Sequence, residues 1–136
     1  MFDILLVSHG PVAQAMLDAA AMVYGPSSER VAALCFEPGQ SQQELLESIT
    51  DAIDNAKDNG GLLVICDILG GSPFLMSAQA YQNIENRASL EVITGMNLAM
   101  IIEAMARRES ASLQEAKEAI VASGMQSIVD FAAQMN

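Results

Sequence analysis

Four short, mainly apolar runs recur along the chain, and a glycine or a carboxylate stands at or close to the end of each. The runs are too short for helices. They are continuous rather than alternating, which is typical of strands buried on both faces of a parallel sheet. The pattern therefore predicts four strands. They begin at Ile4, Val31, Leu62 and Leu90 and end at His9, Phe36, Cys66 and Thr94, respectively.

Between the strands, apolar residues recur every three or four positions, which predicts helices. The predicted helix starts are Pro11, Ser41, Pro73, Asn97 and Ser112. Ser41 and Ser112 each precede a glutamate by three residues, the spacing of a capping box, and Ser72 is predicted to cap the helix that Pro73 begins. The predicted buried face of the first helix consists of Val12, Met16, Ala19, Ala20 and Val23.

The alternation of strand and helix predicts an α/β fold, a doubly wound and mostly parallel sheet with helices on both faces and right-handed crossovers. No internal repeat, low-complexity tract or linker interrupts residues 1–136, so we expect a single domain. Residues 125–136 are ambiguous, because Ile128, Val129 and Phe131 suit either a short helix or an edge strand.

Composition narrows the classes of partner. Seventeen acidic residues against six basic ones give a formal net charge of −11, which disfavours nucleic acid and anionic membrane surfaces. No apolar run approaches the roughly 20 residues of a membrane span, and no basic segment precedes the first run, so we expect a soluble, cytoplasmic protein.

Cys35 and Cys66 lack the spacing of a zinc site and are expected to be reduced thiols. We expect no metal and no cofactor.

Residues with reactive or hydrogen-bonding side chains lie at the carboxyl ends of the predicted strands, the sheet edge where α/β proteins bind ligands. They are His9, Glu37, Asp67 and Asn97, and His9 is the only histidine in the chain. A single imidazole can serve as a nucleophile near neutral pH. If the first and third strands are neighbours whose helices leave to opposite faces, His9 and Asp67 face each other. A carboxylate that accepts one ring N–H leaves the other nitrogen as a free lone pair and stabilises the cation formed on attack.

The turn Gly70-Gly71-Ser72 predicts a binding site for an anion. Its glycines let backbone N–H groups approach a ligand, the helix that Pro73 begins points its positive end there, and the serine hydroxyl can donate. The predicted phosphoryl-binding residues are Gly10, Gly70, Gly71 and Ser72. Nucleophile, orienting carboxylate and anion cradle together indicate phosphoryl transfer through a phosphohistidine.

Each of these residues also has a structural explanation. A lone histidine is more often structural than catalytic, Asp67 can cap the turn that follows it, and Gly-Gly-Ser-Pro is a common loop sequence.

The sequence resembles the IIA component of the mannose class of the bacterial sugar phosphotransferase system. The matching segments are Ile4–Gly10 with its Ser-His-Gly, Phe36–Gly39, Asp67 with Gly70–Phe74, and Val92–Asn97. They occur in the family's order across most of the chain. The resemblance covers a single complete IIA domain, without the linker and IIB domain that some members carry.

This resemblance implies a function and a set of partners. His9 would accept a phosphoryl group from the phosphocarrier HPr and pass it to the IIB component, which phosphorylates a sugar entering through membrane IIC and IID subunits. Asp67 would orient His9, and Ser72 would lie at the phosphoryl site. The family fold is a doubly wound sheet in a homodimer that exchanges an antiparallel edge strand, here expected within Met125–Val129.

Three alternatives remain at the level of sequence. The first is the histidine-carrying domain of a dihydroxyacetone kinase phosphotransfer subunit, although a Met-Gly-Ser-type turn is expected there. The second, a receiver-like module phosphorylated on Asp67, needs an acidic pair and a lysine where this chain has His9 and Gly95. The third is a non-catalytic dimeric regulatory or binding module.

Overall fold

The structure, a computed structural model, describes residues 1–26 and 30–135. Its strands and helices follow the predicted order. They are β1 (Asp3–His9), α1 (Val12–Tyr24), β2 (Val31–Phe36), α2 (Gln42–Ala56), β3 (Leu62–Cys66), α3 (Ser72–Asn83), the 3₁₀ helix η1 (Arg87–Ser89), β4 (Leu90–Ile93), α4 (Leu98–Arg107), α5 (Leu113–Gln126) and α6 (Phe131–Gln134). The four predicted strands are confirmed with ends that differ by one residue or none.

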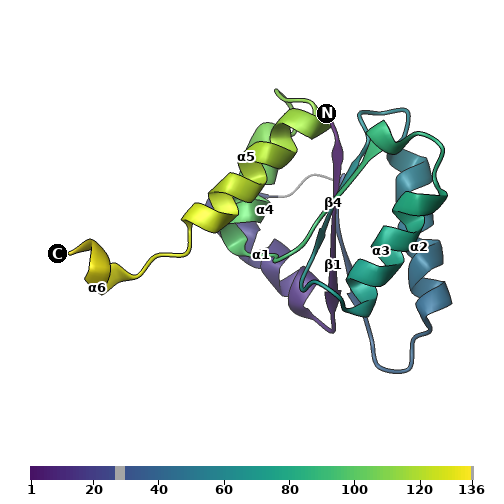
Figure 1. Cartoon of the computed structure of the whole chain (residues 1–136), viewed down its shortest axis with the longest axis horizontal. Helices are drawn as coiled ribbons and strands as arrows, with labels where there is room; N and C mark the ends of the chain where they lie inside the picture. The colour runs from purple at the N-terminus through teal and green to yellow at the C-terminus, as the bar shows by residue number, and fades with distance from the viewer. Residues whose placement is uncertain (27–29, 136) are drawn as a thin grey trace.

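The four strands form one parallel sheet in the order β2-β1-β3-β4. Helices α2 and α3 lie on one side of this sheet, and α1, α4 and α5 lie on the other (Figure 1). The predicted doubly wound α/β fold is therefore confirmed. Since β1 and β3 are neighbours and are followed by helices on opposite faces, the sheet has its topological switch point between them, where ligands bind in such folds.

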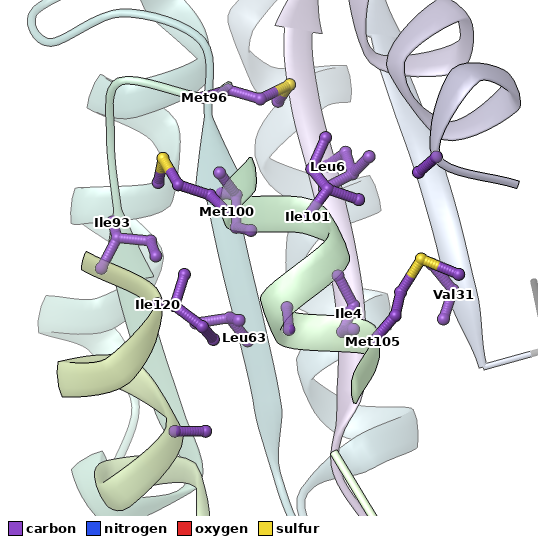
Figure 2. Packing of buried hydrophobic residues seen from close by; sticks show 14 of the residues in the cluster. Ile4, Leu6, Val31, Leu63, Ile93, Met96, Met100, Ile101, Met105 and Ile120 are labelled. Atoms are coloured by element: carbon purple, nitrogen blue, oxygen red, sulfur yellow. The ribbon is translucent and has the colours of Figure 1, made fainter. Parts of the chain in front are cut away.

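Two apolar cores fill the space between the sheet and its helices. On one face, Ile4, Leu6, Leu63 and Ile65 of the central strands pack against α1, α4 and α5, and Figure 2 shows Met100, Ile101 and Met105 of α4 among them. On the other face, Leu5, Val7, Val64 and Cys66 pack against α2 and α3. Successive residues of β1 and β3 thus enter opposite cores, which is why their sequences are continuously apolar.

The predicted buried face of α1 is right only in part. Ala20 is buried and Met16 packs against the core as predicted, but Val12 and Val23 are 41% and 65% exposed, and Ala13 and Leu17 are buried in their place. Apolar residues occur on both sides of this helix, so periodicity alone does not choose between them. The small side chains of Ala13 and Ala20 allow the helix to approach the sheet closely, and this leaves the valines outside.

The end of the chain projects from the body of the molecule (Figure 1). Met125 and Gln126 belong to α5, residues 128–130 adopt neither helix nor strand, and α6 follows. Ile128 and Phe131 are 81% and 73% exposed. Pairing of this segment as an exchanged edge strand requires a second chain and stays a prediction, but Met125 and Gln126 are helical here. Among the described helices, none is long and apolar enough to cross a membrane.

Candidate functional site

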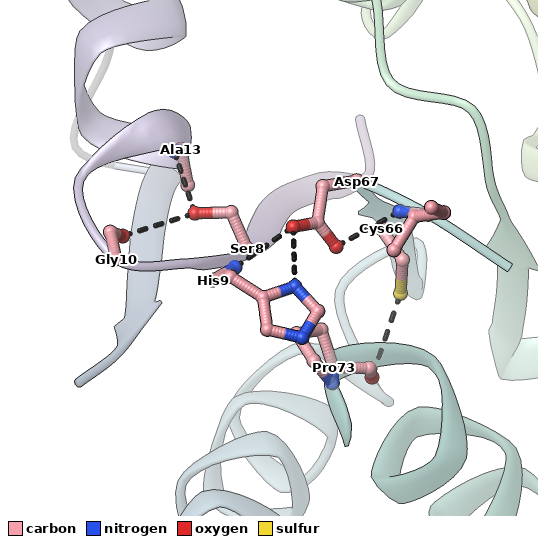
Figure 3. A network of polar contacts seen from close by, with 8 residues as sticks. Ser8, His9, Gly10, Ala13, Cys66, Asp67 and Pro73 are labelled. Atoms are coloured by element: carbon pink, nitrogen blue, oxygen red, sulfur yellow. Dashed lines mark hydrogen bonds and ion pairs between the residues drawn. The ribbon is translucent and has the colours of Figure 1, made fainter. Parts of the chain in front are cut away.

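His9 and Asp67 meet at the switch point of the sheet. His9 is the last residue of β1, and Asp67 directly follows β3. One oxygen of the carboxylate, Oδ2, accepts hydrogen bonds from both the backbone N–H of His9 and its ring Nδ1, each at 2.8 Å (Figure 3). The other oxygen accepts the backbone N–H of Ile68 at 2.8 Å. The predicted pairing of His9 with Asp67 is therefore present.

The Asp67 carboxylate is held in its ionised form. Partial burial acts to raise its pKa, but the hydrogen bonds from the backbone and ring of His9 and from Ile68 outweigh burial and lower the pKa below its ordinary value. An ionised carboxylate only accepts hydrogen bonds, so Nδ1 of His9 carries the proton in this contact. The other ring nitrogen, Nε2, then holds a free lone pair.

The imidazole lies against Gly71, at the start of α3. A Cβ atom on Gly71 would lie 2.5 Å from Cε1 of His9 and 3.0 Å from Nε2. The backbone of Gly71 has a φ of −78°, which any residue adopts, so glycine is required here by the ring and not by the turn. Gly70, with a φ of +91° and open space around it, supplies the turn's unusual backbone angle.

Ser72 is the first residue of α3, and Gly71 occupies the N-cap position without a side-chain cap. The prediction that Ser72 caps this helix is therefore wrong. Its Oγ instead accepts a hydrogen bond from Nε2 of Gln42, at the start of α2, at 3.1 Å. The first backbone N–H groups of a helix have no partner within the helix, so the start of α3 offers donors beside the ring of His9.

Ser8 is a site residue to which sequence reasoning assigned no role. Its side chain is fully buried, and its Oγ accepts the backbone N–H of Ala13 at 2.7 Å and donates to the carbonyl of Gly10 at 3.2 Å (Figure 3). The turn between them passes through Gly10 at a φ of +52°. Ser8 thus ties the start of α1 to the end of β1 around His9. The sequence signal for this role of Ser8 is a single hydroxyl residue next to the histidine, at the end of an otherwise apolar strand.

Behind Asp67, Cys66 joins β3 to α3. Its Sγ lies 3.6 Å from the carbonyl of Pro73 and 3.5 Å from Oγ of Ser77, and the Ser77 hydroxyl also donates to that carbonyl at 2.7 Å. Burial raises the pKa of the Cys66 thiol to about 11. The thiol is therefore neutral and serves as packing that fixes the first turn of α3 beneath His9.

Glu37 and Asn97 have local roles at the same edge of the sheet. The backbone N–H of Glu37 donates to the side chain of Gln40 at 3.2 Å. Asn97 caps α4 by accepting the N–H of Met100 and donates to the carbonyl of Gly124 on α5. No group of three or more potential metal ligands occurs within residues 1–26 and 30–135.

Comparison with known proteins gives consistent matches. A family model described as PTS system fructose IIA component matches residues 3–121. The mannose-specific EIIAB component of Escherichia coli strain K12 is 29% identical over 126 residues, 92% of this chain; the chain spans 38% of the length of that relative. The sorbose-specific EIIA component of Lacticaseibacillus casei is 28% identical over 83% of this chain and 78% of its own length.

Solved structures of related proteins have the same fold. The phosphotransferase system component EIIA of Streptococcus agalactiae superposes with a TM-score of 0.89 at 26% identity, covering 98% of this chain and 99% of that one. A PTS IIA protein associated with the fucose utilization operon of Streptococcus pneumoniae gives a TM-score of 0.85 at 27% identity, with 98% and 96% covered.

Proposed function

Because the chain belongs to the mannose-class IIA components of the bacterial sugar phosphotransferase system, we propose that it carries a phosphoryl group on Nε2 of His9. The group arrives from the phosphocarrier HPr and leaves to a IIB component. One observation supports this most: Asp67 occupies Nδ1 of the chain's only imidazole, so Nε2 is the ring nitrogen with a free lone pair.

The proposed transfer uses only groups around His9. The lone pair of Nε2 attacks phosphorus as the bond between phosphorus and the donor breaks, and the donor leaves with the electrons of that bond. The ring becomes positively charged, and the Asp67 carboxylate, already bonded to Nδ1, stabilises that charge. Transfer to IIB is the reverse of these steps with a new acceptor, so the proton on Nδ1 stays in place throughout.

The start of α3 is proposed to hold the phosphoryl oxygens. A Cβ atom on Gly71 would lie 3.0 Å from Nε2, so a phosphoryl group there lies near the start of α3, with its unpaired N–H groups and the positive end of the helix. The Ser72 hydroxyl is the proposed side-chain donor, and Gly10 and Gly70 shape the two turns that enclose the site. Such contacts stabilise negative charge without requiring a metal or another cofactor.

The proposed setting is that of a IIA component. Residues 1–136 form a single IIA domain that acts in the cytoplasm and joins a membrane transporter of IIC and IID subunits through IIB. We propose a homodimer, because the projecting tail exposes Ile128, Val129 and Phe131. The relatives are named for mannose and sorbose, and we propose that the sugar is selected by components other than this chain.

Reconstitution tests the proposal. Enzyme I, HPr and phosphoenolpyruvate should add one phosphoryl group per chain, and that group should be lost in mild acid, as phosphohistidine is. It should pass on to a purified IIB component encoded with this chain. His9→Ala should take up none and should retain its circular dichroism spectrum. Label retained by His9→Ala, or an acid-stable label, would overturn the assignment, and absence of label in the wild type would favour a binding module.

A further inference from the structure

Gln42 reaches from the start of one helix to the site at the start of another. It is the first residue of α2, and its side-chain Nε2 donates to Oγ of Ser72, the first residue of α3, at 3.1 Å. The preceding residue, Ser41, caps α2 by accepting the N–H of Glu44 at 3.1 Å, so the backbone of Gln42 is fixed in the first turn. Both helices lie on the same face of the sheet and begin at its carboxyl edge (Figure 1).

This hydrogen bond fixes what the Ser72 hydroxyl can do. A hydroxyl has one proton to donate and lone pairs to accept with, whereas an amide NH₂ only donates. When Gln42 donates to Oγ, it uses one lone pair of Ser72, and the hydroxyl proton must point away from that donor. Ser72 follows Gly71, which lies against the ring of His9, so a phosphoryl oxygen on Nε2 is the natural acceptor for that proton.

We propose that Gln42 is a positioning residue for phosphoryl transfer, which holds the Ser72 hydroxyl as a donor toward the phosphoryl group on His9. The inference rests on the proposed function and adds to it a residue outside the Ser-His-Gly and Gly-Gly-Ser-Pro segments. Gln42 touches neither His9 nor Asp67 in the hydrogen bonds described above, so it acts through Ser72.

The position of Gln42 separates this role from a structural one. Its side chain and the hydrogen bond are exposed to solvent, and exposed neutral hydrogen bonds contribute little to folding stability. Loss of the amide should therefore leave the melting temperature unchanged while slowing transfer. A pure brace between α2 and α3 would change stability or docking instead.

The chain offers a matched control in the next residue. Gln43 is also an exposed glutamine in the first turn of α2, and its Nε2 donates to Glu47 of the same helix at 3.3 Å. Gln42→Ala and Gln43→Ala thus remove the same side chain from adjacent positions. Gln42→Glu replaces the donor by a carboxylate, which would accept the Ser72 proton and withdraw it from the phosphoryl group.

Rapid-quench kinetics of phosphoryl transfer from phospho-HPr tests the inference. We expect Gln42→Ala to lower the maximal rate by about three- to ten-fold, the range for one neutral hydrogen bond lost in the transition state, with an unchanged KM for HPr. Gln42→Glu should be slower still, and Gln43→Ala should match the wild type. In a Ser72→Ala background, Gln42→Ala should cause no further loss, because its effect passes through Ser72.

Three results would overturn the inference: an unchanged rate in Gln42→Ala, a loss of equal size in the Ser72→Ala background, or an effect confined to KM. An unchanged rate means that the Gln42–Ser72 hydrogen bond does not contribute to transfer. An equal loss in the Ser72→Ala background means that Gln42 acts without Ser72, and an effect on KM alone means that Gln42 acts in the docking of HPr. These results differ from failure of the proposed function itself, in which the wild-type chain takes up no phosphoryl group from HPr.

Discussion

At the scale of single residues, the site depends on one carboxylate and one glycine that fix the imidazole from two sides. Asp67 accepts the backbone N–H and Nδ1 of His9 with the same oxygen, so the ring cannot turn without breaking a bond. Gly71 leaves room for the ring near Nε2, and there is no space there for a side chain on residue 71. The pairing was predictable, because two strand ends at a switch point must meet. The steric role of Gly71 was not, since it requires knowing where the ring lies.

Replacement of Asp67 by Asn tests the carboxylate. The amide oxygen still accepts hydrogen bonds but brings no negative charge to the ring. Loss of a charge-assisted bond costs about 1.5–3 kcal/mol, so transfer from HPr should slow by roughly ten- to a hundred-fold. Rapid-quench kinetics of phosphoryl transfer from phospho-HPr measures the ratio of the two rates. A variant as fast as the wild type would mean that Asp67 only caps its turn.

The difference in folding stability between the wild type and Asp67→Asn should depend on pH. The folded-state pKa of Asp67 lies below its ordinary value. The ionised carboxylate therefore stabilises the fold above the unfolded pKa of about 3.9, and this stabilisation is lost as pH falls through the folded value. Urea unfolding should show the wild type more stable than Asp67→Asn near pH 6, with the difference shrinking near pH 3. A difference independent of pH would contradict the ionised state of Asp67.

Replacement of Gly71 by Ala tests the fit of the ring. The backbone accepts Ala at a φ of −78°, but the new Cβ would lie 2.5 Å from Cε1 of His9, so the ring must move. Displacement of about 1 Å can cost about a hundred-fold in rate, and we expect a loss of that order with little loss of stability. Gly70→Ala should behave differently, losing stability because its φ is +91°. Full activity in Gly71→Ala would show that the ring has room.

At the scale of elements, the turn from β1 to α1 aims His9. Ser8, fully buried near the end of β1, bonds across this turn, and its hydroxyl replaces the helix cap that Pro11 lacks. Strand positions were predictable, because burial on both faces leaves continuous apolar runs. The buried face of α1 and the Gln42–Ser72 contact were not, since each depends on which small or polar side chain a distant element meets.

Replacement of Ser8 by Ala should affect both stability and transfer. It leaves the backbone N–H of Ala13 buried without its partner, at a cost of about 1–3 kcal/mol in the free energy of unfolding. Ser89→Ala is the matched control, because it removes another buried hydroxyl, bonded to Asn86 at the opposite end of the sheet. Urea unfolding should show losses in both variants, whereas transfer should slow only in Ser8→Ala. Equal transfer in the two would argue against a positioning role for Ser8.

At the scale of the whole molecule, the main exposed apolar segment is the tail after α5. It exposes Ile128, Val129 and Phe131, and β4 is an edge strand of the sheet. A cavity of about 240 Å³, lined by Phe74, Tyr81 and Val92 among others, lies beside β4. An apolar tail and a groove with apolar side chains beside Gln82 and Glu91, on the same chain, are what an exchange between two copies requires.

Truncation after Gln126 tests this exchange, because it keeps α5 and removes the rest of the tail. We expect the full chain to be a dimer and the truncated chain to dissociate or aggregate through its uncovered sheet edge. Light scattering at micromolar concentration measures both. A full-length monomer, or a dimer that survives truncation, would contradict an exchanged tail.

The proposed transfer requires that Asp67 holds Nδ1 of His9 and leaves Nε2 to carry the phosphoryl group. Because the chain has a single histidine, NMR of protein labelled with [¹⁵N]histidine reports on one ring alone. After phosphorylation by enzyme I, HPr and phosphoenolpyruvate, the coupling to phosphorus should appear at Nε2, while Nδ1 keeps its proton. Coupling at Nδ1, or an imidazole without any coupling to phosphorus, would contradict phosphorylation at Nε2 of His9.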